Sequence, residues 1–332
     1  MKKTILCAYL GLLLCWLLAQ FQPPGGEAAT VPSAAPRAES EAPAPAAALP
    51  TAGRRSTLRL LLPDGSVAEK DMQDYLPGVL AAEMPADFPE EALKAQAVAA
   101  RTYALYCADS RKHGDADVCT DPGCCQAWQD EQAQRDKWGG DYERCAARLA
   151  AAVEETAGQV LLYEGAPVFA AFHASSAGAT EDCGQVWNPR PYLVSVSSPE
   201  TAETVPNFIS SLRCAALDFR DTVLSAFPEA DFSGPAETWL GELQRDESGR
   251  VASLVIGGQE IRGTVLRSLF SLRSTAFTLE YTADGFVFTV AGYGHGVGMS
   301  QYGAKLLAED GMDYREILAH YYSGTQLADS GS

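Results

Sequence analysis

The sequence predicts an α+β fold, in which helices and antiparallel strands form one exported domain behind an N-terminal transmembrane helix. The helical part of this prediction rests on residues 87–105, an alanine-rich stretch that opens with the Asp-x-x-Glu spacing of a capping box. The strand part rests on residues 277–290, where apolar side chains alternate on both sides of Asp284-Gly285, as in a β-hairpin.

The N-terminal segment predicts export. In residues 1–21, Lys2 and Lys3 precede a mostly apolar run that is slightly short of the hydrocarbon core of a bilayer. We expect a cytoplasmic tip and an uncleaved single-pass anchor in the cell membrane, with the rest of the chain extracytoplasmic; a cleaved signal peptide is the alternative. Residues 22–56 are rich in proline and alanine, which predicts an extended linker. The domain then covers residues 57–325, and residues 326–332 are a tail.

The charge of the chain excludes one class of partner. It has 43 acidic and 25 basic side chains, a formal net charge of -18, and the charges of the linker cancel, so the acidity belongs to the domain. Binding of nucleic acid requires clustered Lys and Arg, which the sequence lacks. Hydrophobic residues make up 47% of the chain, which excludes a wholly disordered protein.

The first elements of the domain bring a carboxylate to a helix end. A strand at 58–62 turns at Pro63-Asp64-Gly65 into a second strand, and Asp71 then opens a helix that Pro85 ends. The apolar face of this helix continues to Glu83, where an apolar side chain is expected. Glu83 either reaches solvent or an ion pair, or it is a half-buried carboxyl with a raised pKa that donates a proton.

The second helix carries polar side chains within its alanine-rich run. Lys94 and Arg101 are seven residues apart and share a face, and Gln96 also interrupts the apolar composition. These three residues are candidates for substrate contacts, and a solvated stripe is the alternative.

A cluster of His and Cys follows this helix and suggests a metal site. His113, Cys119, Cys124 and Cys125 have the spacing H-x5-C-x4-C-C, and the turn at Pro122-Gly123 lies between them. Four such ligands fit a structural Zn2+, with disulfides or free thiols as the alternatives. The disulfide state of the remaining cysteines of the domain stays open: Cys107, Cys145, Cys183 and Cys214.

Two later motifs add polar residues. Residues 173–178 have the sequence His-Ala-Ser-Ser-Ala-Gly, and the hairpin at 277–290 leads into Gly292–Gly298, where glycines permit close approach of the backbone. A hydrolase triad built on the first motif is not favoured, because no nucleophile elbow or acidic partner accompanies it. The candidate substrate contacts from this part of the chain are His173, Ser175, Ser176, His295, Gln301, Tyr321 and Tyr322; the two tyrosines are also typical of cores.

Three stretches of this chain resemble, in the same order, the signatures of the stage II sporulation protein D family, which includes the amidase-enhancer proteins. They are residues 78–103, residues 173–193 and residues 292–304, and residues 200–270 match only loosely. The resemblance implies a lytic transglycosylase that cuts the MurNAc–GlcNAc bond of peptidoglycan to 1,6-anhydroMurNAc ends, during engulfment in a spore-forming bacterium. Glu83 stands at the position of the family's catalytic acid.

The same resemblance bears on substrate, partner and metal. It implies a glycan strand already stripped of stem peptides, and therefore an amidase- or endopeptidase-type partner that removes them. It also implies zinc held by two His and two Cys, with Cys124 standing where the family has His. The alternative function is a non-catalytic amidase enhancer that binds the wall and activates an amidase.

Overall fold

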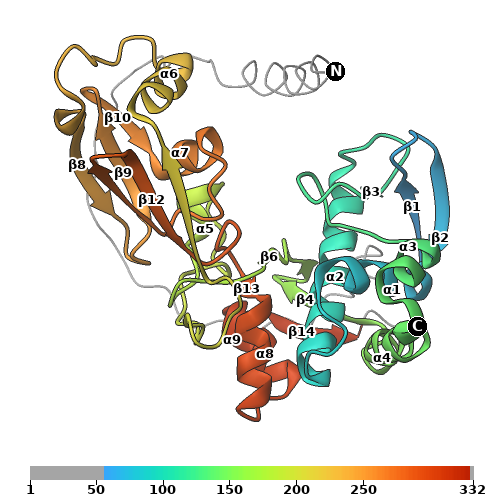
Figure 1. The fold of residues 1–332 in the computed structure, drawn as a ribbon. Coiled ribbons are helices and arrows are strands. Elements are labelled where there is room, and N and C mark those ends of the chain that lie inside the picture. Colours follow the sequence, from blue (N-terminus) through green and yellow to red (C-terminus); the bar gives the residue numbers. More distant parts are fainter. Residues whose placement is uncertain (1–55, 330–332) are drawn as a thin grey trace, which may run out of the picture. The chain divides into compact units, whose positions relative to one another are not determined.

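The computed structural model describes residues 56–329, all within one of the two units into which the chain divides, Ala48–Ser332 (Figure 1). The predicted transmembrane segment lies outside the described residues, as does nearly all of the predicted linker. Within the described part of the chain, no helix is long and apolar enough to cross a membrane. The α+β class is confirmed, although two of the strand pairings, β1 with β3 and β6 with β13, are parallel.

The first group of elements is mainly helical and is preceded by the predicted hairpin. The hairpin pairs two strands antiparallel, and a third strand joins them in the order β2-β1-β3. The strands are β1 (Thr57–Leu61), β2 (Val67–Asp71) and β3 (Val118–Cys119). The helices are α1 (Met72–Glu83), α2 (Glu90–Ser110), α3 (Glu131–Trp138), a 3-10 turn (Gly139–Asp141) and α4 (Tyr142–Glu155).

The sequence predicted the start of α1 correctly but not the start of α2. The Asp71 carboxylate caps α1 by accepting from the Gln73 backbone N–H, and α1 ends just before Pro85, as expected. The predicted capping box of α2 is wrong. The N-cap is Pro89 and no side chain caps the helix, because Asp87 lies two residues too early. The last turns of α2 also extend beyond the predicted end, to Ser110.

The second group combines short strands with the C-terminal helices. β4 (Gln159–Tyr163) pairs antiparallel with both β5 (Ala166–Pro167) and β14 (Gln326–Asp329). Residues 326–329, predicted as a tail, therefore form an edge strand; four residues are too few for a periodic signal. The other elements are β6 (Phe172–His173), β13 (Met299–Ser300), α5 (Cys183–Val186), α8 (Gln301–Glu309) and α9 (Tyr314–Tyr321).

The third group is rich in strands and contains the predicted hairpin of residues 277–290. It has two antiparallel sheets, in the orders β11-β12-β7 and β10-β9-β8, drawn with α6 and α7 in yellow to dark orange in Figure 1. The strands are β7 (Ile209–Cys214), β8 (Leu240–Arg245), β9 (Val251–Ile256), β10 (Gln259–Arg262), β11 (Phe277–Thr282) and β12 (Gly285–Ala291). The helices are α6 (Ala216–Ala226), α7 (Gly263–Leu269) and a 3-10 turn (Ala236–Thr238).

Each group has its own buried apolar cluster. The first joins α1, α2 and α4, and the second joins the opposite side of α2 to β4, α8 and α9. The third is confined to the strand-rich group and includes five phenylalanines. Helix α2 is therefore buried on two sides, which its small alanine side chains permit.

Candidate functional site

Glu83 ends α1 as a half-buried carboxylate held by two donors. Its Oε1 accepts a hydrogen bond from the Ala127 backbone N–H at 2.8 Å, and its Oε2 lies 3.5 Å from the Gln301 side-chain amide nitrogen. No Lys, Arg or His nitrogen of the described residues comes within ion-pair distance of it. Burial raises the pKa of Glu83 above its usual range, although both hydrogen bonds oppose the shift.

A hollow of about 460 Å³ opens beside Glu83. Residues 82–87 line one side of it and the α3–α4 corner lines the other, where Trp138 supplies an aromatic ring. Asp87 and Asp141 also line this hollow, so Glu83 is not its only carboxylate. The hollow therefore gives a ligand access to a carboxyl whose pKa is raised by burial.

The His/Cys cluster predicted from the sequence is brought together in space. The ligand atoms of His113, Cys119, Cys124 and Cys125 lie within 4.8 Å of one another. The His113 Nε2 is 3.1 Å from the Cys125 Sγ and 3.6 Å from the Cys124 Sγ. Ligands of a tetrahedral zinc, bound at ~2.0–2.3 Å, are about 3.5 Å apart, close to these two separations, so this donor set could hold the ion with a small adjustment of the wider pairs. The cluster includes Cys124, which replaces the histidine expected there.

The cluster adjoins the Glu83 carboxylate through three consecutive residues. Cys125 is followed by Gln126, whose amide donates to the Tyr75 hydroxyl at 2.9 Å and to the Ala100 carbonyl at 3.3 Å. Ala127 then donates its backbone N–H to Glu83. The conformation of the cysteine turn therefore sets the position of one of the two donors on the carboxylate. A backbone donor leaves no residue-type signal, and sequence reasoning missed it.

All seven cysteines of the described residues are free thiols. One of them, Cys107, shares a hydrogen bond with the Cys125 thiol, so it lies beside the cluster without belonging to it. Cys107 lies in the last turn of α2 and His113 follows the end of that helix, so their short separation was the available signal.

The polar residues of α2 are buried and serve different partners. Lys94 forms ion pairs with Glu90 and Glu155, each at 2.6 Å. Arg101 donates to the carbonyls of Gln159 and Val153, and burial lowers the pKa of Arg101 to about 10. Both side chains thus tie α2 to neighbouring segments.

Gln96 differs from these two residues, because its buried amide has no hydrogen-bond partner among the described residues. Contact of Lys94, Gln96 and Arg101 with substrate stays a prediction.

The His173 motif forms a buried polar cluster. The His173 Nε2 is 2.7 Å from the Ser176 hydroxyl, and its Nδ1 is 3.2 Å from the Val297 carbonyl. Glu200 accepts from the Ser176 backbone N–H and from the Ser300 hydroxyl. Burial holds the pKa of His173 well below its ordinary value. Ser176 is fully buried, so this serine–histidine pair has no access for a substrate acyl group, in keeping with the rejection of a hydrolase triad.

Ser175 is also buried, and its backbone pairs with that of Tyr293 in the glycine-rich loop. His295 of that loop lies against Trp187, with ring centroids 4.7 Å apart, and burial lowers the pKa of His295 to about 3. The imidazole is therefore neutral at physiological pH. Of the C-terminal candidates, Gln301 is the one whose side chain contacts Glu83.

The tyrosine pair at the end of α9 is part of the second core. Tyr321 shares a hydrogen bond with the Ser198 hydroxyl at 2.9 Å, and Tyr322 donates to the Ala171 carbonyl at 2.9 Å. Both rings are almost completely buried. The alternative that the sequence left open, a core position, accounts for their environment, and their predicted contact with substrate is untested.

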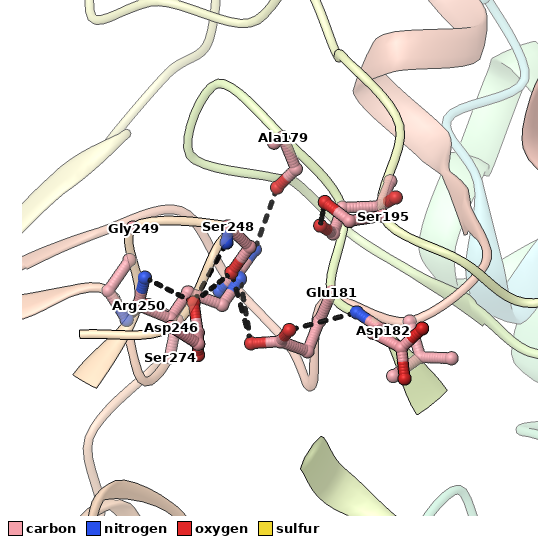
Figure 2. Close-up of polar contacts among 12 residues, drawn as sticks. Ala179, Glu181, Asp182, Ser195, Asp246, Ser248, Gly249, Arg250 and Ser274 are labelled. Atoms are coloured by element: carbon pink, nitrogen blue, oxygen red, sulfur yellow. Dashed lines mark hydrogen bonds and ion pairs between the residues drawn. The ribbon is translucent and has the colours of Figure 1, made fainter. Parts of the chain in front are cut away.

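A buried charged node that the sequence did not predict joins residues 179–182 to the loop at 246–250 (Figure 2). Arg250 and Glu181 are both buried, with the Arg250 Nε 3.8 Å from the Glu181 Oε2, and the Arg250 guanidinium also donates to the Ala179 carbonyl at 3.3 Å. Ser248 bridges Glu181 and Asp246 through its hydroxyl. Burial, followed by the neighbouring Asp246, raises the pKa of Glu181 to about 7. Arg250 lies in the part of the chain that matched the motifs only loosely.

Comparison with known proteins gives matches over most of the domain. A family model described as "Stage II sporulation protein" matches residues 65–163, and a model of a domain of unknown function matches residues 228–298. Stage II sporulation protein D of Bacillus subtilis (strain 168) is 33% identical over 270 residues, which cover 80% of this chain and 76% of that protein. The protein of the same name from Bacillus amyloliquefaciens is 33% identical over 271 residues, or 80% and 77%. The amidase enhancer of B. subtilis (strain 168) is 29% identical over 305 residues, or 76% and 40%.

Proposed function

The chain belongs to the stage II sporulation protein D family, and from this membership we propose that it cleaves peptidoglycan glycan strands as a lytic transglycosylase. The observation that supports the proposal most is the state of Glu83. It is a half-buried carboxyl with a raised pKa and two hydrogen-bond donors, and it forms no ion pair with the described residues, although Lys137 and Arg144 line the same hollow. These are the properties of a general acid.

One carboxyl is enough for the proposed reaction. Glu83 donates its proton to the glycosidic oxygen as the bond from the MurNAc C1 to that oxygen breaks. The resulting carboxylate then takes the proton from the MurNAc 6-hydroxyl, whose oxygen forms a new bond to C1. The products are a 1,6-anhydroMurNAc end and a free GlcNAc hydroxyl, and Glu83 is protonated again. Water does not enter the balance, in contrast to hydrolytic glycosidases, which use two carboxylates.

The donors on Glu83 have distinct tasks in this scheme. The Ala127 N–H and the Gln301 amide stabilise the carboxylate after proton donation and fix which oxygen faces the substrate. His113, Cys119, Cys124 and Cys125 would hold a structural zinc, which supplies no Lewis-acid chemistry when all four positions are protein ligands. These four residues would thereby fix the turn that carries Ala127.

The setting of the reaction is also part of the proposal. We propose that the domain acts outside the cytoplasmic membrane behind its predicted anchor, during engulfment in sporulation. Its substrate is the denuded strand left by an amidase- or endopeptidase-type partner that removes stem peptides. The membership in a sporulation family supports this setting.

A second function is favoured by one comparison. The match to an amidase enhancer covers 76% of this chain, so a role in binding the wall and stimulating an amidase is the alternative. The two functions differ in what the purified chain does alone. A lytic enzyme shortens denuded strands without an amidase, whereas an enhancer leaves them intact and raises the rate of an added amidase.

The deciding experiment is incubation of the purified chain with denuded glycan strands, followed by mass spectrometry of the products. The proposal predicts fragments that end in 1,6-anhydroMurNAc, with no gain of water. Fragments that gain one water would instead identify a hydrolase, with Asp87 or Asp141 as the second carboxylate. Intact strands, together with stimulation of an added amidase, would establish the enhancer.

A further inference from the structure

A group of aromatic side chains on the described part of the chain has no task in the scheme above. We define it as the aromatic band: Tyr103, Tyr106, Phe169, Phe172 and Trp187. Resting on the proposed function, we propose that the aromatic band and Arg190 form a saccharide subsite of their own. In this subsite Trp187 stacks on a sugar ring, and Arg190 pairs with the lactyl carboxylate of a MurNAc residue.

The rings of the aromatic band touch one another in series. The Phe169 ring lies 5.4 Å from Trp187 in an edge-to-face arrangement, 5.3 Å from Tyr106 and 5.5 Å from Tyr103, measured between centroids. Tyr103 in turn lies 6.5 Å from Phe172. Such contacts fix the rings in position, so that little side-chain entropy is lost when a ligand stacks on them.

Exposure within the aromatic band is concentrated at Trp187. Its side chain is 43% exposed, while the other four rings are half-buried beneath or beside it. The indole N–H makes no hydrogen bond to any described residue, so it is available to a ligand hydroxyl. A large exposed ring with a free polar edge matches a pyranose, which presents an apolar C–H face bordered by hydroxyls.

Arg190 gives this surface its selectivity for charge. Its guanidinium donates to the Tyr106 hydroxyl at 2.7 Å and lies 5.7 Å from the Tyr106 ring centroid and 6.0 Å from that of Phe169. No carboxylate of the described residues forms an ion pair with it. The remaining donors of a half-buried guanidinium are suited to a carboxylate, which accepts two parallel hydrogen bonds.

The support behind Trp187 is rigid. His295 packs against the indole from the glycine-rich loop, and the next residue, Gly296, lies on the buried guanidinium of Arg250. A Cβ at position 296 would lie only 2.7 Å from the Arg250 Cζ, so the approach requires glycine. The Gly296 carbonyl also accepts from the Glu181 backbone N–H, which ties this loop to the node of Figure 2.

The inner end of the aromatic band adjoins the Glu83 site through sheet register. Phe172 and His173 form β6, which pairs with Met299 and Ser300 of β13. The next residue, Gln301, is the one whose amide contacts Glu83. In the proposal, the sugars next to the one bound at Glu83 reach the aromatic band. The carboxylate-bearing sugar of such a strand is MurNAc, and Arg190, which forms no ion pair with a described carboxylate, is suited to pair with it.

Binding to the inactive chain tests this subsite without requiring turnover. The ligands are a peptide-free GlcNAc–MurNAc tetrasaccharide and neutral chitotetraose, each titrated calorimetrically into the full chain carrying Glu83→Gln. Adding Trp187→Ala is expected to raise the Kd for both sugars about tenfold, and Trp187→Tyr to restore most of the affinity. Adding Arg190→Gln is expected to raise the Kd about fivefold for the MurNAc sugar alone.

Matched controls come from the strand-rich group. Tyr281 is 38% exposed and Arg213 is exposed on β7, so Tyr281→Ala and Arg213→Gln remove similar side chains elsewhere and should change the Kd by less than about twofold. An unchanged Kd in Trp187→Ala overturns the subsite. An equal loss for both sugars in Arg190→Gln overturns the carboxylate assignment. Failure of the proposed function shows up separately, as products that gain water or as full activity in Glu83→Gln.

Discussion

The helical region (residues 56–198 and 299–329) and the strand-rich region (residues 209–291) bury different kinds of side chain. The core of the strand-rich region combines aliphatic side chains with aromatic rings, of which Phe219 and Phe286 are stacked with centroids 4.0 Å apart. The helical region buries polar groups such as Gln96, Arg101 and His173 beside its apolar clusters. The strand-rich region also buries a cation, Arg250, but it lies outside the apolar cluster of that region. Burial of polar groups costs free energy unless each is bonded. The difference teaches that the helical region, which contains the candidate site around Glu83, has polar side chains at buried positions where apolar side chains would pack at lower cost.

The largest expected effect is on activity, from Glu83→Gln in the helical region. The amide keeps the shape but carries no proton to donate, so cleavage of denuded strands should fall by about 10²–10⁴-fold while the melting temperature stays the same or rises. The amount of cleaved product is measured by mass spectrometry. Glu242→Gln on exposed β8 is the matched control and should keep full activity. Full activity in Glu83→Gln would show that Glu83 of the helical region is not the general acid.

The next effect is on stability, from Phe286→Ala in the strand-rich region. This ring is fully buried against Phe219, Trp239 and Tyr281, and its loss should cost about 3–5 kcal/mol in the free energy of unfolding, measured by urea denaturation.

The exposed Leu217→Ala of the same region is the control for Phe286→Ala, with an expected change below about 0.5 kcal/mol. Activity of the folded fraction should persist. A loss of activity in folded Phe286→Ala would contradict the expectation that catalysis depends on the helical region alone.

Removal of the metal ligands tests whether the cysteine turn positions Ala127. In Cys119→Ser we expect less than one zinc per chain and a fall in activity of about 10²-fold, because a shift of ~1 Å in the donor misplaces Glu83. The zinc content per chain is measured by elemental mass spectrometry. Cys214→Ser in the strand-rich region is the control and should keep both zinc and activity. Equal activity with and without metal would show that metal binding at the His/Cys cluster does not affect the position of the Glu83 carboxylate.

The smallest expected effect concerns the pH dependence of stability at Glu181. Its pKa is about 7 in the fold against about 4.3 in an unfolded chain, so the stability it contributes is present below about pH 4.3 and is lost as pH rises through 7. The groups that face it are Asp246 and Arg250. In Glu181→Gln, urea denaturation between pH 5 and 8 should show a shallower decline than in the parent chain. In the control Glu242→Gln, the free energy of unfolding should fall with pH as steeply as in the parent chain. An equally steep fall in Glu181→Gln would contradict the raised pKa of Glu181.

The sequence predicted the helical region better than the strand-rich one, for physical reasons. Glu83 was singled out because a carboxylate stood on an apolar helical face, and its role as an acid stays a prediction. The His/Cys cluster could be predicted because its four candidate ligands lie within thirteen residues of one another. The Ala127 donor and the aromatic band depend on contacts between distant segments. In the strand-rich region, Arg250 looks like an ordinary exposed cation in a turn, and only the fold shows it buried beneath Gly296.

The packing of α2 has a consequence for biosynthesis. One side of this early helix is covered by α9 and by β4, which is itself completed by β14 at the far end of the chain. The first signature therefore cannot reach its final form until residues 299–329 have been synthesised and delivered. In the proposed export across the membrane, the alanine-rich face of α2 would stay uncovered until these residues follow, which favours a holding chaperone or a fast translocation step. A chain that stalls before Met299 would be an early target for quality-control proteases.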